Sequence, residues 1–282
     1  MPGTLFLVAT PIGNLEDISA RALRVLGDVA LIAAEDTRRT AHLLSRYGIP
    51  TATTSLHEHN EARKAPSLVA RLQAGDSIAL VSDAGTPLLS DPGRHLVQLA
   101  IDAGIRIEPI PGPSAIVAAV AASGFSTQPF TFLGFPPTGS KDRKEWLSAL
   151  AASGSTVVFF ESPHRIRGTL EEILTQVGDY PVVICRELTK LHEELVRGPI
   201  SSALQTTSLD AGELTVVMDI GQKPENEPAG QASDQELLVE IGQITHSLRI
   251  SRRQAIQRLA RKYGRQPNDI YAAVERVKRS GK

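Results

Sequence analysis

Residues 78–93, IALVSDAGTPLLSDPG, have the composition of a loop that contacts a ligand. The first five are apolar or small, which suits a short buried strand ending at Ser82. Turn-forming residues then follow at high density: Asp83, Gly85, Pro87, Asp91, Pro92 and Gly93. A plain connection from strand to helix needs only about two to six residues. The sequence therefore predicts a fixed loop that exposes backbone amides and carbonyls to a bound molecule.

Two more loops of turn-forming residues follow predicted strands. Thr10–Asn14 comes after the apolar run Leu5–Ala9, and Pro111–Ser114 comes after the predicted strand 106–109. In an open α/β sheet, ligands bind in the crevice beyond the carboxyl ends of the strands. We therefore expect these two loops and the loop after Ser82 to line one pocket.

Charged residues at two other strand ends have side chains suited to acid–base chemistry. The segments EDTRR, residues 35–39, and HEHN, residues 57–60, each follow a predicted strand. The candidates are Glu35, Asp36, Arg38, His57, Glu58, His59 and Glu187. Any of these residue types also forms salt bridges that only stabilise a fold. Their expected place on the same cleft favours Asp36, Arg38, His57 and Glu58. No metal-ligand spacing such as H-E-x-x-H occurs, so we predict no metal site.

The elements that must position these residues alternate between strand and helix. Residues 1–125 predict an α/β lobe with a mostly parallel sheet, whose first helix spans Glu16–Leu26. The segment 134–144, GFPPTGSKDRK, has linker-like composition, and the strand–helix pattern then resumes in a second lobe, 126–222. A second linker at 222–232 precedes a helical tail, 233–282. The sequence thus predicts two α/β lobes with a ligand crevice between them.

Composition excludes several protein classes. The 282 residues are 41% apolar and 22% charged, which is ordinary for a globular protein. No apolar run reaches the roughly 18 residues of a membrane-spanning helix, and the N-terminus lacks a basic signal-peptide segment. Cys185 is the only cysteine, which rules out an intrachain disulfide. We expect a cytoplasmic protein with no membrane segment.

The net charge of −1 is unevenly distributed. From Arg249 onward there are eleven Lys or Arg residues and two acids, Asp269 and Glu275, a net charge of +9. The rest of the chain carries −10. A basic tail on an acidic body predicts contact between the tail and a polyanion. A solvated helix or a contact between two copies of the chain would also account for the tail.

Several segments match a known family in order and at its spacing: VATPIGNLEDIS, AEDTRRTAHLL, SLHEHNE, SDAGTPLLSDPG, PIPGPSA, ESPHR and RELTK. On these motifs the chain resembles the tetrapyrrole methylase superfamily, and the resemblance covers essentially the whole chain. Within it, the chain is most similar to the small-subunit rRNA cytidine 2′-O-methyltransferases. The resemblance implies the two-lobed tetrapyrrole methylase-like α/β fold of class III methyltransferases, with a C-terminal helical tail. It also implies a homodimer that binds S-adenosyl-L-methionine and methylates 16S rRNA in the 30S ribosomal subunit.

The resemblance also suggests which loop residues hold the cofactor. They are Pro11, Gly13, Asp83, Ala84, Gly85, Thr86, Pro87, Gly112, Ser114, Leu188 and Thr189. Because a sulfonium is positive, its pocket should present carbonyl oxygens in preference to Lys or Arg side chains. Lys190 follows a predicted strand of the second lobe and is a separate candidate for the lining of the pocket. Asp83 could equally only cap its turn, and Ser114 could only cap a helix. A ribose hydroxyl is a very weak acid, so we expect a general base, either Asp36 or His57.

Two other functions fit parts of the sequence. A tetrapyrrole C-methyltransferase would carry GPGD-type and GDP-type loops where this chain has TPIGN and SDAGTP. A DNA-binding regulator could use the tail helices, but it would not account for two lobes with Pro- and Gly-rich loops. A dinucleotide site of the Rossmann type lacks its G-x-G-x-x-G motif.

Overall fold

The computed structural model describes residues 2–205, 208–221, 234–248, 251–262 and 266–280. The chain forms two compact units, Met1–Lys223 and Pro224–Lys282. The first unit contains two five-stranded sheets, each of which forms an α/β lobe with the helices packed on it. The linker predicted at 222–232 lies outside the described residues.

The first sheet is entirely parallel, as the alternation of strands and helices predicted. Its strands are β1 (Thr4–Val8), β2 (Leu31–Ala34), β3 (Thr53–Ser55), β4 (Ile78–Val81) and β5 (Arg106–Ile110). They lie in the order β3-β2-β4-β1-β5. Every residue of β2 and β4 is buried, which is typical of parallel strands covered on both faces. Because β2 and β4 are parallel neighbours, their carboxyl ends lie side by side.

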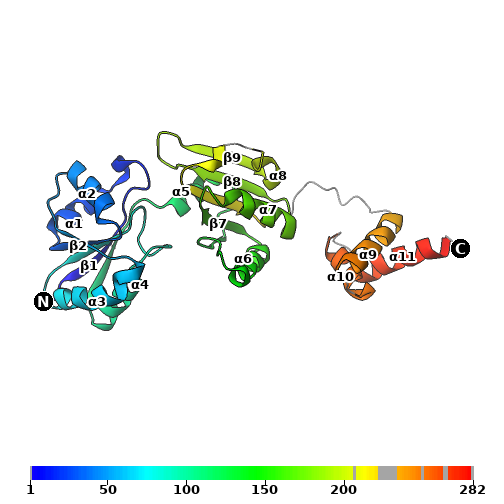
Figure 1. Ribbon diagram of the computed structural model, residues 1–282, viewed down its shortest axis with the longest axis horizontal. Coiled ribbons are helices and arrows are strands. Elements are labelled where there is room, and N and C mark those ends of the chain that lie inside the picture. Colours follow the sequence, from blue (N-terminus) through cyan, green and yellow to red (C-terminus); the bar gives the residue numbers. More distant parts are fainter. Residues whose placement is uncertain (1, 206–207, 222–233, 249–250, 263–265, 281–282) are drawn as a thin grey trace. The chain divides into compact units, whose positions relative to one another are not determined.

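Helices cover both faces of this sheet (Figure 1). The helices α1 (Ala20–Asp28) and α2 (Thr37–Arg46) pack against one face, where Ile32 and Ala34 point. The helices α3 (Glu58–Gln73) and α4 (Arg94–Asp102) pack against the other, with Leu31 and Ala33. Adjacent residues of one strand thus enter different cores, because successive side chains of a strand point to opposite faces.

The first helix begins later than the predicted Glu16. A short 3-10 helix, η1 (Leu15–Asp17), comes first, and α1 begins only after Ser19. The side chain of Asn14 accepts a hydrogen bond from the backbone N–H of Glu16, and that of Ser19 accepts one from Ala22. Two successive side-chain caps divide the segment into two separate helical elements in place of one continuous helix.

The second sheet is mixed. Its strands are β6 (Phe130–Phe132), β7 (Thr156–Glu161), β8 (Pro181–Arg186), β9 (Glu194–Pro199) and β10 (Leu214–Asp219). They lie in the order β6-β7-β10-β8-β9, and only β6 and β7 run parallel. One face is covered by α6 (Ser140–Ala152), α7 (Ile166–Gln176) and α8 (Ile200–Ala203), and η2 (Ser208–Asp210) precedes β10.

The linker predicted at 134–144 is wrong in its second half, because α6 begins at Ser140. The apolar side of this helix buries Trp146, Leu147 and Leu150, and the indole Nε1–H of Trp146 donates to the carbonyl of Leu133 at 3.1 Å. Charged residues fill the first turn and mask the apolar side in the local composition. Residues 134–139 are the true connection between strand and helix.

The opposite face of the second sheet is covered by α5 (Ala115–Ser123). Ile116 and Val120 pack there with Val158 and Val217. The guanidinium of Arg197, on β9, donates to the carbonyls of Ser123 and Ala122 at 2.7 and 2.6 Å, which satisfies the end of α5. A helix that precedes residue 125 therefore belongs by packing to the second lobe.

The described residues of the C-terminal unit form three helices, in agreement with the predicted helical tail. They are α9 (Asp234–Leu248), α10 (Arg252–Lys262) and α11 (Pro267–Ser280). Leu237, Leu259 and Ile270, one from each helix, share a buried core. The guanidinium of Arg252 pairs with Glu275 at 2.7 Å, joining α10 to α11. Within the described part of the chain, no helix has both the length and the apolarity to cross a membrane.

Candidate active site

A cavity of about 460 Å³ is lined by loops of both lobes in the first unit. On the first-lobe side lie the loop Asp83–Thr86 after β4, the segment Leu89–Asp91 and the start of α5. On the second-lobe side lie Phe135, the segment 160–163 after β7, Leu188 and the segment 212–215. The volume is within the range of small-molecule sites, roughly 300–1,000 Å³.

Hydrogen bonds join the three loops that follow β1, β4 and β5. Thr10 and Gly85 form an isolated antiparallel bridge, each N–H donating to the other residue's carbonyl at 2.9 and 3.0 Å. Gly85 has φ 81°, a left-handed conformation that glycine adopts without steric cost. The hydroxyl of Thr86 donates to the carbonyl of Pro113 at 3.2 Å, which ties in the third loop. The loop after β4 is thus fixed by hydrogen bonds on two sides.

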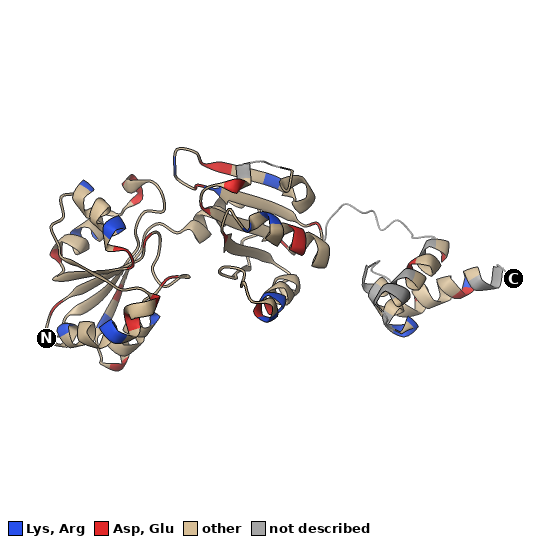
Figure 2. Ribbon diagram, viewed as in Figure 1, with Lys and Arg blue, Asp and Glu red and all other residues tan. Residues whose placement is uncertain are grey.

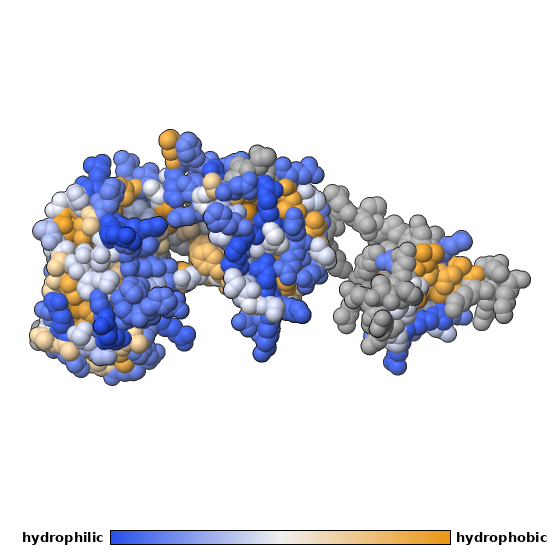
Figure 3. All heavy atoms as spheres, in the orientation of Figure 1, coloured by the Kyte–Doolittle hydropathy of each residue, from blue (hydrophilic) through white to orange (hydrophobic). Residues whose placement is uncertain are grey.

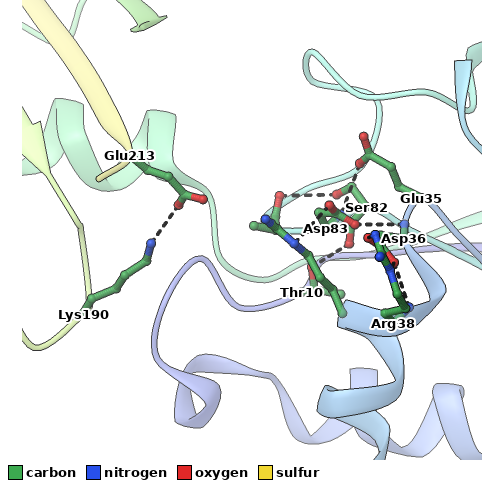
Figure 4. A network of polar contacts seen from close by, with 10 residues as sticks. Thr10, Glu35, Asp36, Arg38, Ser82, Asp83, Lys190 and Glu213 are labelled. Atoms are coloured by element: carbon green, nitrogen blue, oxygen red, sulfur yellow. Dashed lines mark hydrogen bonds and ion pairs between the residues drawn. The ribbon is translucent and has the colours of Figure 1, made fainter. Parts of the chain in front are cut away.

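Carboxylates cluster where β2 and β4 end (Figure 4). Asp83 accepts a hydrogen bond from the backbone N–H of Asp36 at 3.0 Å, and its own N–H donates to the carboxylate of Glu35 at 3.3 Å. The guanidinium Nε of Arg39 lies 3.5 Å from the Asp83 carboxylate. Asp83 therefore links the two strand ends and also lines the cavity.

Asp36 is held by its own helix. Its carboxylate caps α2 by accepting from the backbone N–H of Arg38 at 2.8 Å, and it receives two further bonds from the Arg38 guanidinium at 3.1 and 2.7 Å. These bonds lower the pKa of Asp36 to about 2. The carboxylate is therefore ionised near neutral pH and has little affinity for a proton.

Two carboxyls of the cavity have pKa values shifted in the opposite direction. The pKa of Asp91 is raised to about 6, chiefly by burial and also by the charges of Glu35 and Asp83, while a hydrogen bond with Ser82 acts to lower it. Burial also raises the pKa of Glu35. The segment that carries Asp91 is strained, because Leu88 and Ser90 have φ 75° and 74°. Such strain is concentrated at functional sites.

The two lobes contact each other directly beside the cavity. The backbone N–H of Asn14 donates to Oγ1 of Thr189 at 3.0 Å. A Cβ on Gly13 would lie 2.7 Å from both the carbonyl oxygen of Leu188 and Oγ1 of Thr189, so only glycine fits there. Glu187 and Thr189 have φ 52° and 66°, which gives the facing loop its sharp shape.

The model of a family described as Tetrapyrrole (Corrin/Porphyrin) Methylases matches residues 4–204, which span both lobes. The chain belongs to the tetrapyrrole methylase family. It is 46% identical over 230 residues to the ribosomal RNA small subunit methyltransferase I of Escherichia coli O157:H7, covering 80% of each chain. It is 43% identical over 274 residues to the enzyme of that name from Halalkalibacterium halodurans, covering 95% of this chain and 93% of the relative.

The fold agrees with solved structures of this family. One is the uroporphyrin-III C-methyltransferase of Thermus thermophilus complexed with S-adenosyl homocysteine, with a TM-score of 0.55 and 16% identity. The match covers 77% of this chain and 98% of that one. At this identity the likeness concerns the fold alone. The predicted fold class and the predicted family are both confirmed, and the protein is a methyltransferase.

The structure brings together part of the predicted cofactor set of this tetrapyrrole methylase. The predicted residues that line the cavity are Asp83, Ala84, Gly85, Thr86, Ser114 and Leu188. Those that do not line it are Pro11, Gly13, Pro87, Gly112 and Thr189. Gly13 and Thr189 lie at the contact between lobes, and a Cβ on Gly112 would lie 3.0 Å from that of Ala9. Gly13 and Gly112 therefore allow close packing of the loops around the cavity.

The predicted catalytic residues lie outside the cavity lining. Asp36 and Arg38 adjoin it through the bond to Asp83, and the side chain of Arg38 is 89% exposed. His57 caps α3, donating its backbone N–H to Oδ1 of Asn60 at 3.0 Å, and Glu58 is exposed in the first turn. Both follow β3, the strand at the edge of the first sheet, while the cavity lies by β4.

Lys190 does not line the cavity, but it holds a residue that does. Its ammonium group pairs with Glu187 at 2.9 Å. It also pairs with Glu213, which lines the cavity, at 3.0 Å (Figure 4). Hydrogen bonds from the backbone of Glu213 and from Lys190 lower the pKa of Glu187. Glu187, one of the acid–base candidates, is therefore a structural partner of Lys190.

Several lining residues belong to neither the cofactor set nor the favoured catalytic set predicted from the sequence: Glu35, Arg39, Asp91, Phe135, Glu161 and Glu213. Glu35 is one of the seven acid–base candidates taken from the sequence. Asp91 is one of the turn-forming residues of the loop after Ser82, so the sequence also indicates that it lies near a ligand. Phe135 lies in the segment interpreted as a linker. Among the described residues there is no group of three or more His, Cys, Asp or Glu side chains that could hold a metal ion.

Proposed function

We propose that the protein is an S-adenosylmethionine-dependent methyltransferase that methylates a cytidine ribose 2′-hydroxyl of 16S rRNA in the small ribosomal subunit. The main support is the match to relatives named ribosomal RNA small subunit methyltransferase I, which in one case covers 95% of this chain. The resemblance of the loops to those of rRNA cytidine 2′-O-methyltransferases supports a cytidine ribose as the acceptor of the methyl group. A ribosomal substrate implies a cytoplasmic enzyme.

The cavity has the chemistry that this cofactor requires. When bound, S-adenosylmethionine supplies a methyl group on a positively charged sulfur. Glu35, Asp83 and Asp91 place carboxylates on the first-lobe wall, where a cation is favoured. Gly85 lets the backbone of its loop come close to a ligand, since it carries no Cβ. The loop Asp83–Thr86, the start of α5 and Leu188 would hold the cofactor.

The chain must also align the ribose and accept its proton. Positioning of the reacting groups can supply ~7–11 kcal/mol of barrier reduction, and the bonded loops around Gly85 and Asp83 provide a rigid frame for it. Asp36 and His57 are the bases expected from the sequence. Asp91 lines the cavity and has a higher proton affinity than Asp36, so we propose Asp91 as the proton acceptor.

Arg38 and the histidine-rich segment then have a different role in this proposal. The side chain of Arg38 is 89% exposed beside the cavity, where it can contact an RNA phosphate. His57 and Glu58 follow β3, the neighbour of β2 in the sheet, so in this proposal they too contact the RNA. The homodimer implied by the resemblance remains part of the proposal. Its support is the outer side of α5, where Val117 is 62% exposed and Ala121 is also exposed.

Methyl transfer to isolated 30S subunits tests the function. The subunits come from a strain lacking the modification, the methyl group of the cofactor is radiolabelled, and the modified nucleotide is mapped. We expect label on one ribose 2′-oxygen of 16S rRNA. Uroporphyrinogen III is assayed in parallel. Label in that compound and none in 30S subunits would overturn the proposal and assign the tetrapyrrole C-methyltransferase activity.

A further inference from the structure

The loop between β6 and α6 presents an aromatic ring to the cavity. Phe135 lines the cavity, yet 51% of its surface is exposed. Its ring contacts Phe160 at a centroid distance of 5.3 Å, with 51° between the ring planes. Water-exposed apolar surface gives no stability to the fold. An exposed ring at a ligand cavity therefore needs an explanation in terms of binding.

The loop holds the ring in place through its backbone. The carbonyl of Gly134 accepts a hydrogen bond from the N–H of Phe160 at 3.0 Å, the guanidinium of Arg165 donates to the carbonyl of Pro136, and Arg143 donates to that of Pro137 at 3.2 Å. Arg143 also pairs with Glu172 at 2.5 Å and is only slightly exposed. These bonds anchor the residues on both sides of Phe135, so its exposed position is built into the loop.

A second apolar side chain lines the same cavity from the first lobe. Leu89 is 43% exposed and lies between Leu88 and Ser90, both of which have left-handed backbone. The two loops adjoin, since a Cβ on Gly134 would lie 3.5 Å from Oγ of Ser90. Each lobe thus contributes one exposed apolar side chain to the cavity. Two such surfaces suit a flat ring, because stacking needs apolar faces and no specific polar partner.

Positive charge follows the aromatic loop directly. Lys141 and Lys144, in the first turns of α6, are exposed and have no ion pair with another described residue. In Figure 2 the ribbon of α6 carries blue segments of Lys and Arg together with red segments of Asp and Glu. Elsewhere, hydrophilic residues cover much of the first unit's surface in the view of Figure 3. Lysines on the helix that follows the loop of an exposed ring favour a nucleic-acid strand over a small neutral ligand, since the phosphates of the strand need cations and its bases need a surface for stacking.

We propose that Phe135 and Leu89 form a stacking subsite for the base of the nucleotide that is methylated. The proposal rests on the proposed function, because it takes RNA as the substrate. Stacking the base outside its helix would bring the attached ribose to the cavity where the carboxylates lie. With aromatic residues at 4% of the chain, Phe135 is one of few rings available for this purpose.

Kinetics of Phe135 variants in the full-length enzyme test the subsite. Phe135→Ala and Phe135→Leu should lower kcat/KM for 30S subunits about 10- to 100-fold through a higher KM, while the cofactor Kd from calorimetric titration changes less than about twofold. Phe135→Tyr keeps the ring and should restore the KM. Phe130→Ala removes a 40% exposed ring outside the cavity lining and should leave both constants near wild type.

Three results would overturn the inference. An unchanged kcat/KM in both Phe135→Ala and Phe135→Leu would show that no base stacks there. A cofactor Kd that rises as much as KM would assign the ring to the adenine of the cofactor. A wild-type enzyme that is inactive on 30S subunits would overturn the proposed function, and this inference with it. Circular dichroism of each variant confirms that the fold is intact, and Phe135→Leu retains apolar bulk if Phe135→Ala unfolds.

Discussion

Asn14 and Thr189 join the two lobes by a hydrogen bond from the backbone N–H of one to Oγ1 of the other, at 3.0 Å, across 175 positions of sequence. Gly13, where a Cβ would lie too close to the facing loop, precedes Asn14, and Thr189 has the left-handed φ of 66°. The bond lies beside the cavity that both lobes line. The shape of that cavity therefore depends on how closely these two loops approach.

Gly13→Ala should disturb this contact. Its Cβ would lie 2.7 Å from the backbone oxygen of Leu188, which cannot move without its loop. Overpacking of this kind costs about 1–3 kcal/mol, so we expect a lower Tm and a weaker cofactor Kd. Gly27→Ala is the matched control, because a Cβ there meets no atom within 4 Å. Equal Tm and Kd values for the two variants would show that the contact does not control the cavity.

Gly85→Val should abolish cofactor binding and leave the fold intact. A β-branched residue is strained at φ 81°, and its Cβ would lie 3.4 Å from the side chain of Ile12 within the lining of the cavity. Calorimetric titration with S-adenosylmethionine measures the effect, and circular dichroism reports the fold. A folded variant with wild-type affinity would contradict a close approach of this loop to the cofactor.

Three variants separate the candidate bases. Asp91→Asn should lower kcat roughly 100-fold or more with little change in cofactor affinity, because it removes the proton acceptor of the cavity. Asp36→Asn and His57→Ala test the bases expected from the sequence. If kcat falls by the same factor in Asp36→Asn or His57→Ala while Asp91→Asn stays active, the residue changed in that variant is the base. The assay is single-turnover methyl transfer to 30S subunits.

Stability should depend on pH through Asp91. Its pKa is raised from 3.8 to about 6 in the folded protein, so the folded state binds the proton more tightly than the unfolded state does. The favourable contribution is complete below about pH 4 and disappears as the pH rises through about 6. Above that, Asp91→Asn should have a higher Tm than wild type, because it carries no buried charge. Tm values measured from about pH 4 to 8 would contradict this if the difference stayed constant.

Removal of the C-terminal unit should weaken RNA binding. Truncation after Gln222 removes the segment from Arg249 onward, which carries a net charge of +9. We expect cofactor Kd to remain nearly unchanged and binding to 30S subunits to become weaker and less dependent on salt. The logarithmic salt slope should decrease by about 0.7–0.9 for each phosphate that the truncated protein no longer neutralises. An unchanged slope would show that other residues bind the phosphates.

Two controls make the truncation interpretable. Sedimentation compares the oligomeric state of the full-length and truncated chains, since the tail could join two copies. Charge reversal at Lys141 and Lys144 measures the contribution of α6. Arg143 is not a useful position for this purpose, because its guanidinium pairs with Glu172 and holds the loop of Phe135.

Local sequence determined the elements of the first lobe and the loops that carry chemistry. Apolar runs followed by Pro, Gly and Asp predicted the strands and loops around Thr10 and Asp83, because turn chemistry and burial are local properties. The same local information failed at α6, where charged residues precede an apolar side. It also failed to separate η1 from α1, since the capping side chains of Asn14 and Ser19 follow each other closely.

Only the tertiary structure decided which side chains meet. Period-two alternation in a strand determines its two faces but does not name its neighbour, so neither the order β3-β2-β4-β1-β5 nor the antiparallel pairing in the second sheet was accessible. The pairing of β2 with β4 places Asp36 against Asp83, and the contact between lobes adds Phe135 to the cavity. The sequence predicted a methyltransferase and placed its cofactor on these loops. Long-range packing decided that Asp91 and Phe135 line the cavity while His57 lies outside its lining.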